Sequence, residues 1–129
     1  MSNCQTLPRR TGVDNNKYPA WVDITAKDAE ASRTFYSQLF GWRIPVLEAI
    51  DYGVVESGPD TLPGGIGQQD DQRPAGIVTY FSVDDVEASL ARAEELGGKV
   101  AVPPWEIPGL GKMAIFLDPD GNRVGLWKD

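Results

Sequence analysis

Asp28-Ala-Glu-Ala-Ser32 and Asp85-Val-Glu-Ala-Ser89 are two closely similar stretches in different halves of the chain. The match continues at the same offset, because Leu39-Phe-Gly41 corresponds to Leu96-Gly-Gly98. A self-match that keeps a fixed offset over a whole unit is the usual sign of repeated structural units. The sequence therefore predicts one compact domain made of two copies of a strand–helix–strands unit.

The first copy opens with alternating residues, which are typical of a strand with two different faces. One face carries Val22, Ile24 and Ala26, and the other carries Trp21, Asp23 and Thr25. Asp28 is suited to cap a helix that runs to about Phe40 and ends at Gly41. We expect the buried stripe of this helix to consist of Phe35, Tyr36, Leu39 and Phe40. Short strands are predicted over residues 42–47, 52–56 and 62–68.

The second copy repeats this order. Residues 77–83 predict a strand, and Asp84-Asp-Val-Glu87 predicts the acidic start of a helix. The apolar stripe of that helix is expected to contain Val86, Leu90, Ala93 and Leu96. Residues 99–102, 112–117 and 123–127 predict strands, with a long loop over 103–111 and a turn over 118–122.

The boundaries follow from composition. Residues 1–18 are polar and without periodicity, which predicts a flexible leader before a single domain over 19–129. Within that domain, the first module covers about 19–69 and the second about 76–129, with a linker between them. No apolar run is long enough for a membrane span, which requires about 20 residues.

Charge and cysteine content narrow the possible partners. The formal net charge of the 129 residues is −7, which disfavours binding to nucleic acid or to anionic membranes. Cys4 is the only cysteine, so no internal disulfide is possible, and a cytoplasmic location is expected. There is no histidine, which excludes Ser–His–Asp and Cys–His catalytic arrangements.

Five stretches resemble the vicinal oxygen chelate superfamily, which includes glyoxalase I, bleomycin-resistance proteins, fosfomycin-resistance enzymes and extradiol dioxygenases. The stretches cover residues 21–28, 35–42, 80–88, 95–100 and 116–127. The resemblance implies an α+β fold in which two tandem βαβββ modules form a curved mixed sheet around a ligand cavity. It also implies a homodimer.

The same resemblance implies where a metal would be held. The positions that supply ligands in the metalloenzymes of the superfamily are occupied here by Trp21, Val78 and Gly125, with Gln68 at or near the fourth. Metal sites of that kind depend on imidazole and carboxylate ligands, and neither is present at these positions. Asp70-Asp71 and Asp118/Asp120 read better as solvated acidic loops. We therefore expect no metal and no cofactor.

Seven residues are candidates for ligand binding. They are Trp21, Asp23, Val78, Tyr80, Trp105, Gly125 and Trp127. Trp21 and Tyr80 offer stacking surfaces for a flat or cationic ligand or, alternatively, fill the core. Gly125 inside a strand suggests that something needs its room, either a ligand or a crossing side chain such as Trp21. Trp105 belongs to the Pro103–Gly111 loop, which is long enough to act as a lid or is anchored by the buried tryptophan.

Two main functions are compatible with these residues. The first is a metal-independent protein that binds and sequesters a hydrophobic or cationic aromatic small molecule. The second is a metal-independent isomerase, lyase or hydrolase in which Asp23, Tyr80 or Glu106 supplies acid–base groups. A third and weaker alternative is a regulatory module with a vestigial cavity.

Overall fold

The computed structural model describes residues 18–58, 61 and 63–129. Its elements in chain order are β1 (Pro19–Ala26), α1 (Ala29–Phe40), β2 (Val46–Leu47), β3 (Tyr52–Val54), β4 (Gly64–Gln68), β5 (Gly76–Ser82), α2 (Val86–Glu95), β6 (Lys99–Ile107), β7 (Gly111–Leu117) and β8 (Arg123–Lys128). The predicted leader, apart from Tyr18, lies outside the described residues. No helix in the described part of the chain is long and apolar enough to cross a membrane.

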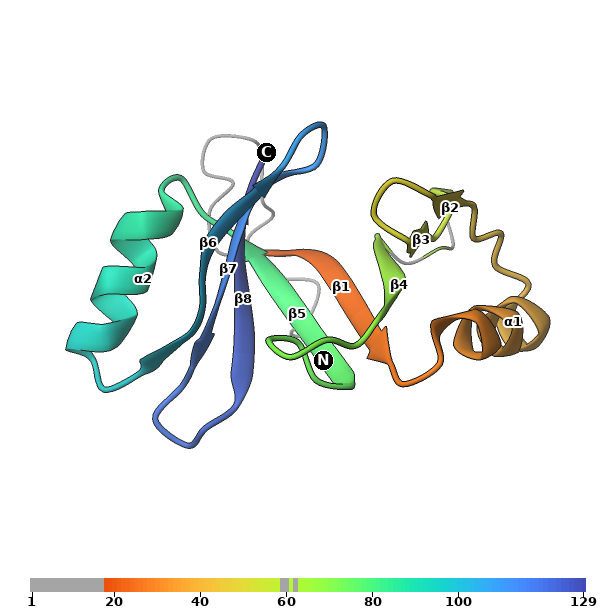
Figure 1. Ribbon diagram of the computed structural model, residues 1–129. Helices are drawn as coiled ribbons and strands as arrows, with labels where there is room; N and C mark the ends of the chain where they lie inside the picture. Colours follow the sequence, from red (N-terminus) through yellow and green to blue (C-terminus); the bar gives the residue numbers. More distant parts are fainter. Residues whose placement is uncertain (1–17, 59–60, 62) are drawn as a thin grey trace, which may run out of the picture.

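One curved, mixed sheet contains all eight strands, in the order β2-β3-β4-β1-β5-β8-β7-β6 (Figure 1). In each module the first strand pairs in parallel with the last, β1 with β4 and β5 with β8. The two modules join where β1 and β5 pair antiparallel. The strand order of one half thus mirrors the other, and the predicted α+β fold of two βαβββ modules is confirmed.

Equivalent residues begin the two helices. The Asp28 carboxylate accepts a hydrogen bond from the backbone N–H of Ala31 at 3.1 Å, and the Asp85 carboxylate accepts one from Ala88 at 2.9 Å. Such caps satisfy backbone donors that the first helical turn leaves free. Gly41 ends α1 in the left-handed conformation, at a φ of 74°. These caps confirm that the short repeated sequence motif marks the same structural position in both modules.

The two helices differ in how they cover the sheet. Helix α2 packs against β6, β7 and β8, and its Val86 and Leu90 are buried with Ala114 and Leu126. Helix α1 contacts mainly β1 and β4, and Ala29 is the one residue of this helix that is buried. The apolar core behind the sheet is therefore concentrated in the second module.

The predicted buried stripe of α1 is wrong. Phe35, Leu39 and Phe40 are 57%, 58% and 56% exposed. The Phe40 ring stacks on Tyr36 and packs at a tilt against Trp42, with 4.8 Å between the Phe40 and Trp42 centroids, and Phe35 meets Tyr36 edge-on. The predicted stripe of α2 is correct for Val86 and Leu90, but Leu96 is 61% exposed because it lies beyond the last turn.

The predicted loop over 103–111 is also wrong. Strand β6 extends through it to Ile107, and only a tight turn separates β6 from β7. Prolines normally interrupt strands because they lack a backbone N–H, but they are tolerated at sheet edges and bulges. Strand β6 is an edge strand, and its pairing with β7 shifts register between Val102 and Trp105, around Pro103 and Pro104.

Gly125 makes room for the Tyr80 ring. The two residues are paired across β5 and β8, and a Cβ atom at Gly125 would lie 2.3 Å from Tyr80 Cδ2. Gly65 and Gly67 of β4 make the same kind of space for the ring of Tyr52. Each tyrosine thus lies flat over a glycine on the next strand. The crossing side chain at Gly125 is Tyr80, not Trp21.

We predict that Gly125→Ala destabilises the protein by about 1–3 kcal/mol, because overpacking a close contact forces ring and strand apart. Chemical denaturation measures this change in the free energy of unfolding. Gly58→Ala is the matched control, since a Cβ there would meet only Thr61 at an ordinary 3.6 Å. Equal unfolding free energies for the two variants would contradict the packing role of Gly125.

Candidate functional site

A cavity of about 680 Å³ lies between the two modules and is lined by residues of both. Five aromatic side chains contribute to its wall: Trp21, Tyr52, Tyr80, Trp105 and Trp127. The first two come from the first module, and the other three from the second. Apolar side chains such as Met113 and Ile107 complete the wall near the two tryptophans of the second module.

The structure places five of the predicted binding residues on this wall: Trp21, Asp23, Tyr80, Trp105 and Trp127. Val78 does not reach it, because it is buried among Met113, Ile115 and their neighbours. Gly125 lies beneath the Tyr80 ring. Glu106 lines a separate hollow with Lys112, since successive side chains of a strand point to opposite faces.

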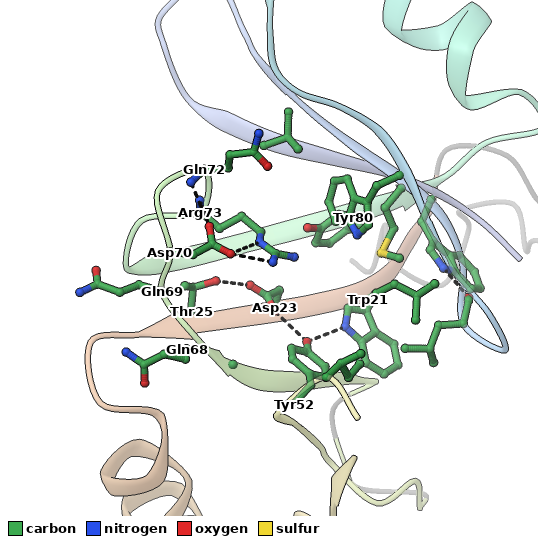
Figure 2. A pocket seen from close by; sticks show the side chains of 18 of the residues that line it. Trp21, Asp23, Thr25, Tyr52, Gln68, Gln69, Asp70, Gln72, Arg73 and Tyr80 are labelled. Atoms are coloured by element: carbon green, nitrogen blue, oxygen red, sulfur yellow. Dashed lines mark hydrogen bonds and ion pairs between the residues drawn. The ribbon is translucent and has the colours of Figure 1, made fainter. Parts of the chain in front are cut away.

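A chain of hydrogen bonds ends on the Asp23 carboxylate (Figure 2). Trp21 Nε1 donates to the Tyr52 hydroxyl at 3.1 Å, and Tyr52 donates to Asp23 Oδ1 at 2.7 Å. The Thr25 hydroxyl donates to Asp23 Oδ2. An indole N–H can only donate, so it fixes the direction of this chain. Asp23 is therefore the final acceptor, and each carboxylate oxygen keeps capacity for a further donor.

Burial is the main influence on the Asp23 carboxyl, which is 9% exposed. It raises the pKa of Asp23, and the hydrogen bonds from Thr25 and Tyr52 and the charge of Arg73 oppose it only in part. Burial and the Asp23 charge also raise the pKa of Tyr52 and of Tyr80. Both tyrosines therefore remain protonated donors at neutral pH.

Arg73 reaches the cavity from the linker between the modules. The Asp70 carboxylate accepts hydrogen bonds from the backbone N–H of Gln72 and of Arg73, which closes a tight turn. The same carboxylate accepts a hydrogen bond from Arg73 Nη2 at 2.8 Å. The guanidinium lies 5.5 Å from the centre of the Trp105 ring, so Arg73 connects the linker turn to strand β6.

Sequence reasoning missed Tyr52 and Arg73. The glycine-rich strand β4 was the available signal for Tyr52, because Gly65 and Gly67 imply a large ring on a neighbouring strand. That signal does not say which residue the ring belongs to. Arg73 gave no signal, because it belongs to a polar linker whose folding back over the cavity depends on tertiary contacts.

The residues at the expected metal positions do not fit a metal ion. Trp21 offers an indole N–H that already donates to Tyr52, and Val78 and Gly125 have no donor atoms. The Gln68 amide is occupied, since its Oε1 accepts from Ala29 N at 3.0 Å and its Nε2 donates to Lys27 O at 2.7 Å. Among residues 18–58, 61 and 63–129, no three Asp, Glu or Cys side chains lie close enough to hold a metal.

The fold is shared with known proteins. The Mn(II)-bound glyoxalase from Novosphingobium aromaticivorans superposes with a TM-score of 0.63 at 24% identity, covering 89% of this chain and 40% of that one. At this level of sequence identity, the superposition shows that the two proteins share a fold and nothing more. A glyoxalase/bleomycin resistance protein/dioxygenase superfamily member from Vibrio splendidus superposes with a TM-score of 0.60 at 15% identity, covering 84% of this chain and 96% of that one.

Sequence comparison agrees. The anthracycline biosynthesis protein DnrV of Streptomyces peucetius is 35% identical in an alignment of 127 positions, which covers 85% of this chain and 46% of DnrV. This chain therefore spans about half the length of that relative. Residues 19–126 match the sequence profile of the glyoxalase/bleomycin resistance protein/dioxygenase superfamily. The chain belongs to that superfamily.

Proposed function

We propose that this protein binds a flat aromatic small molecule in the cavity between its modules, without a metal ion. The observation that supports this most directly is one cavity lined by five aromatic side chains together with the buried carboxylate of Asp23. Aromatic walls stabilise flat ligands by stacking and by burial of apolar surface. The volume of about 680 Å³ lies within the range of roughly 300–1,000 Å³ that is typical of small-molecule sites.

The name of DnrV supports a polycyclic ligand. Anthracyclines are fused-ring aromatic compounds, and this chain shares 35% identity with a protein named for their biosynthesis. The residues at the expected metal positions support a metal-independent site, because none of them carries the imidazole or carboxylate group that such metal sites use. Sequestering of such a ligand requires only the cavity and its walls.

We predict that an anthracycline, with daunorubicin as the probe, binds with a dissociation constant that changes less than about twofold on addition of EDTA, Mn²⁺ or Zn²⁺. Trp105→Ala should weaken binding about 10-fold, since loss of a stacking ring removes on the order of 1 kcal/mol or more. Isothermal titration calorimetry measures both effects.

Trp42→Ala is the matched control, because Trp42 packs on α1 and does not line the cavity. This variant should bind daunorubicin with the same dissociation constant as the unaltered protein. A ligand that binds only after metal is added would contradict the metal-independent site. Failure of planar aromatic compounds to bind at all would contradict the proposed function.

The buried carboxylate favours a second candidate function, proton transfer by a metal-independent enzyme. Asp23 has a raised pKa and faces a mostly apolar cavity, as general bases often do. Tyr80 presents a hydroxyl to the same space. Glu106 does not belong to this candidate mechanism, because it lies outside the cavity. The name of a 25% identical protein from Didymella fabae, a glyoxylase-like domain-containing protein, is compatible with this activity.

The raised pKa of Asp23 predicts how stability depends on pH. Below about pH 3.8, its ordinary pKa, the carboxyl is protonated in both the folded and the unfolded chain. As pH rises, the unfolded chain loses this proton first, so the free energy of unfolding falls until the folded-state pKa is passed. Asp23→Asn should remove this part of the decline, and the variant should be the more stable form at pH 8.

Urea denaturation between pH 4 and pH 8 measures this difference. Asp120→Asn is the control, since Asp120 is an exposed carboxyl in the turn between β7 and β8. The difference in unfolding free energy between Asp23→Asn and the unaltered protein should grow with pH. A difference that stays constant across this range would show that Asp23 is not destabilised by burial.

We further propose that the protein forms a homodimer. The support is the exposed apolar surface of α1, where Phe35, Leu39 and Phe40 are each more than half exposed. Light scattering should then give about twice the 14.1 kDa mass of one chain, and Phe35→Ser with Leu39→Ser should shift the protein toward monomer. A single species near 14.1 kDa would contradict the dimer.

A further inference from the structure

The Tyr80 hydroxyl faces the cavity without a protein partner. Tyr80 is only 4% exposed, and its ring is held by Gly125 below and by the edge of Trp105 at 6.5 Å between centroids. No side chain or backbone group among the described residues forms a hydrogen bond with its hydroxyl. The hydroxyl is open to the cavity, so a ligand atom there can supply the hydrogen-bond partner that it lacks among the described residues.

Asp23 offers the complementary group. Its two oxygens each accept one hydrogen bond from the protein, and carboxylate oxygens can each accept more. Figure 2 shows the Asp23 carboxylate and Tyr80 on neighbouring strands, facing the same part of the cavity. One strand therefore presents an acceptor with spare capacity, and its neighbour presents a hydroxyl that is open to the cavity.

The positive charge of Arg73 affects which ligand groups can bind near Asp23 and Tyr80. Its guanidinium binds Asp70 through Nε and Nη2, so Asp70 already pairs with it. It nevertheless acts electrostatically on both Asp23 and Tyr80. A cationic group placed between these two residues would be attracted by Asp23 but repelled by Arg73. A neutral group avoids that repulsion.

We propose that the cavity selects neutral phenols: a flat aromatic ligand whose hydroxyl donates to Asp23 and accepts from the Tyr80 hydroxyl. A phenol supplies one donor and free acceptor capacity on a single oxygen, which matches both walls at once. An ammonium group has donors only and leaves the Tyr80 O–H without an acceptor. This inference rests on the proposed aromatic binding function and replaces the expectation of a cationic ligand.

Equilibrium dialysis at pH 7.5 tests it with four probes that share one ring system: 2-naphthol, 2-methoxynaphthalene, naphthalene and 2-naphthylmethylamine. The phenol remains neutral at this pH and the amine is a cation. We expect 2-naphthol to bind about 10- to 100-fold more tightly than its methyl ether, because a hydrogen bond to a buried carboxylate is lost on methylation. The amine should also bind more weakly than the phenol.

Three variants assign the preference to these residues. Asp23→Asn and Tyr80→Phe should each reduce the advantage of 2-naphthol over naphthalene by about 10-fold, while naphthalene itself is bound as before. Tyr80→Phe keeps the ring over Gly125, so the packing is preserved. Arg73→Gln should improve binding of the amine relative to the phenol. Tyr36→Phe removes a hydroxyl outside the cavity and should change nothing.

The outcomes separate this inference from the proposed function. Binding of all four probes with similar affinity would overturn the selection of phenols and leave aromatic binding intact. Tighter binding of the amine would overturn it in favour of a cationic ligand. Absence of binding by every probe would overturn both. Because naphthalene binding reports a folded cavity in each variant, a variant that has lost its fold is recognised directly.

Discussion

The antiparallel pairing of β1 with β5 is the interaction on which the rest of the structure depends. It joins the two modules into one sheet and places Trp21 opposite Tyr80 and Asp23 opposite Val78. Because residues two apart on a strand share a face, Trp21, Asp23, Tyr80 and Val78 all lie on one side of this pair. The first three line the cavity, whereas Val78 is covered by neighbouring core side chains. Curvature of the sheet on either side of this pair then forms the walls.

Space for the aromatic walls comes from glycines on adjacent strands. Tyr52 and Tyr80 occupy opposite modules, and each ring lies where a neighbouring strand has no side chain. Glycine destabilises a strand because it loses more backbone entropy on folding than other residues and has no side chain to pack. The rings recover some of that packing and are held against the sheet. Their hydroxyls are thereby fixed relative to Asp23, which is the condition for a site with directional hydrogen bonds.

The sequence predicted the repeated modules, both helix caps and four of the five aromatic residues that line the cavity, because each depends on local patterns: alternation, capping and turn residues. It failed where tertiary context overrides local pattern. The aromatic residues of α1 have helical spacing, yet they remain exposed, since the helix lies at the side of the sheet. Pro103 and Pro104 resemble a loop, yet an edge strand with shifted register accommodates them. Tyr52 and Arg73 join the site only through folding of β3 and the linker over the cavity.

The polar groups of the site come from three separate parts of the chain. The donors that fix Asp23 belong to the first module, Tyr80 belongs to the second, and Arg73 belongs to the linker between them. Within one module, Asp23 would lack the facing hydroxyl, and Tyr80 would lack the carboxylate. In the assembled domain, a buried carboxylate that raises the free energy of the folded protein becomes the strongest acceptor available to a ligand. The burial that destabilises Asp23 is therefore also what makes the cavity selective, and the pairing of the two modules produces both effects together.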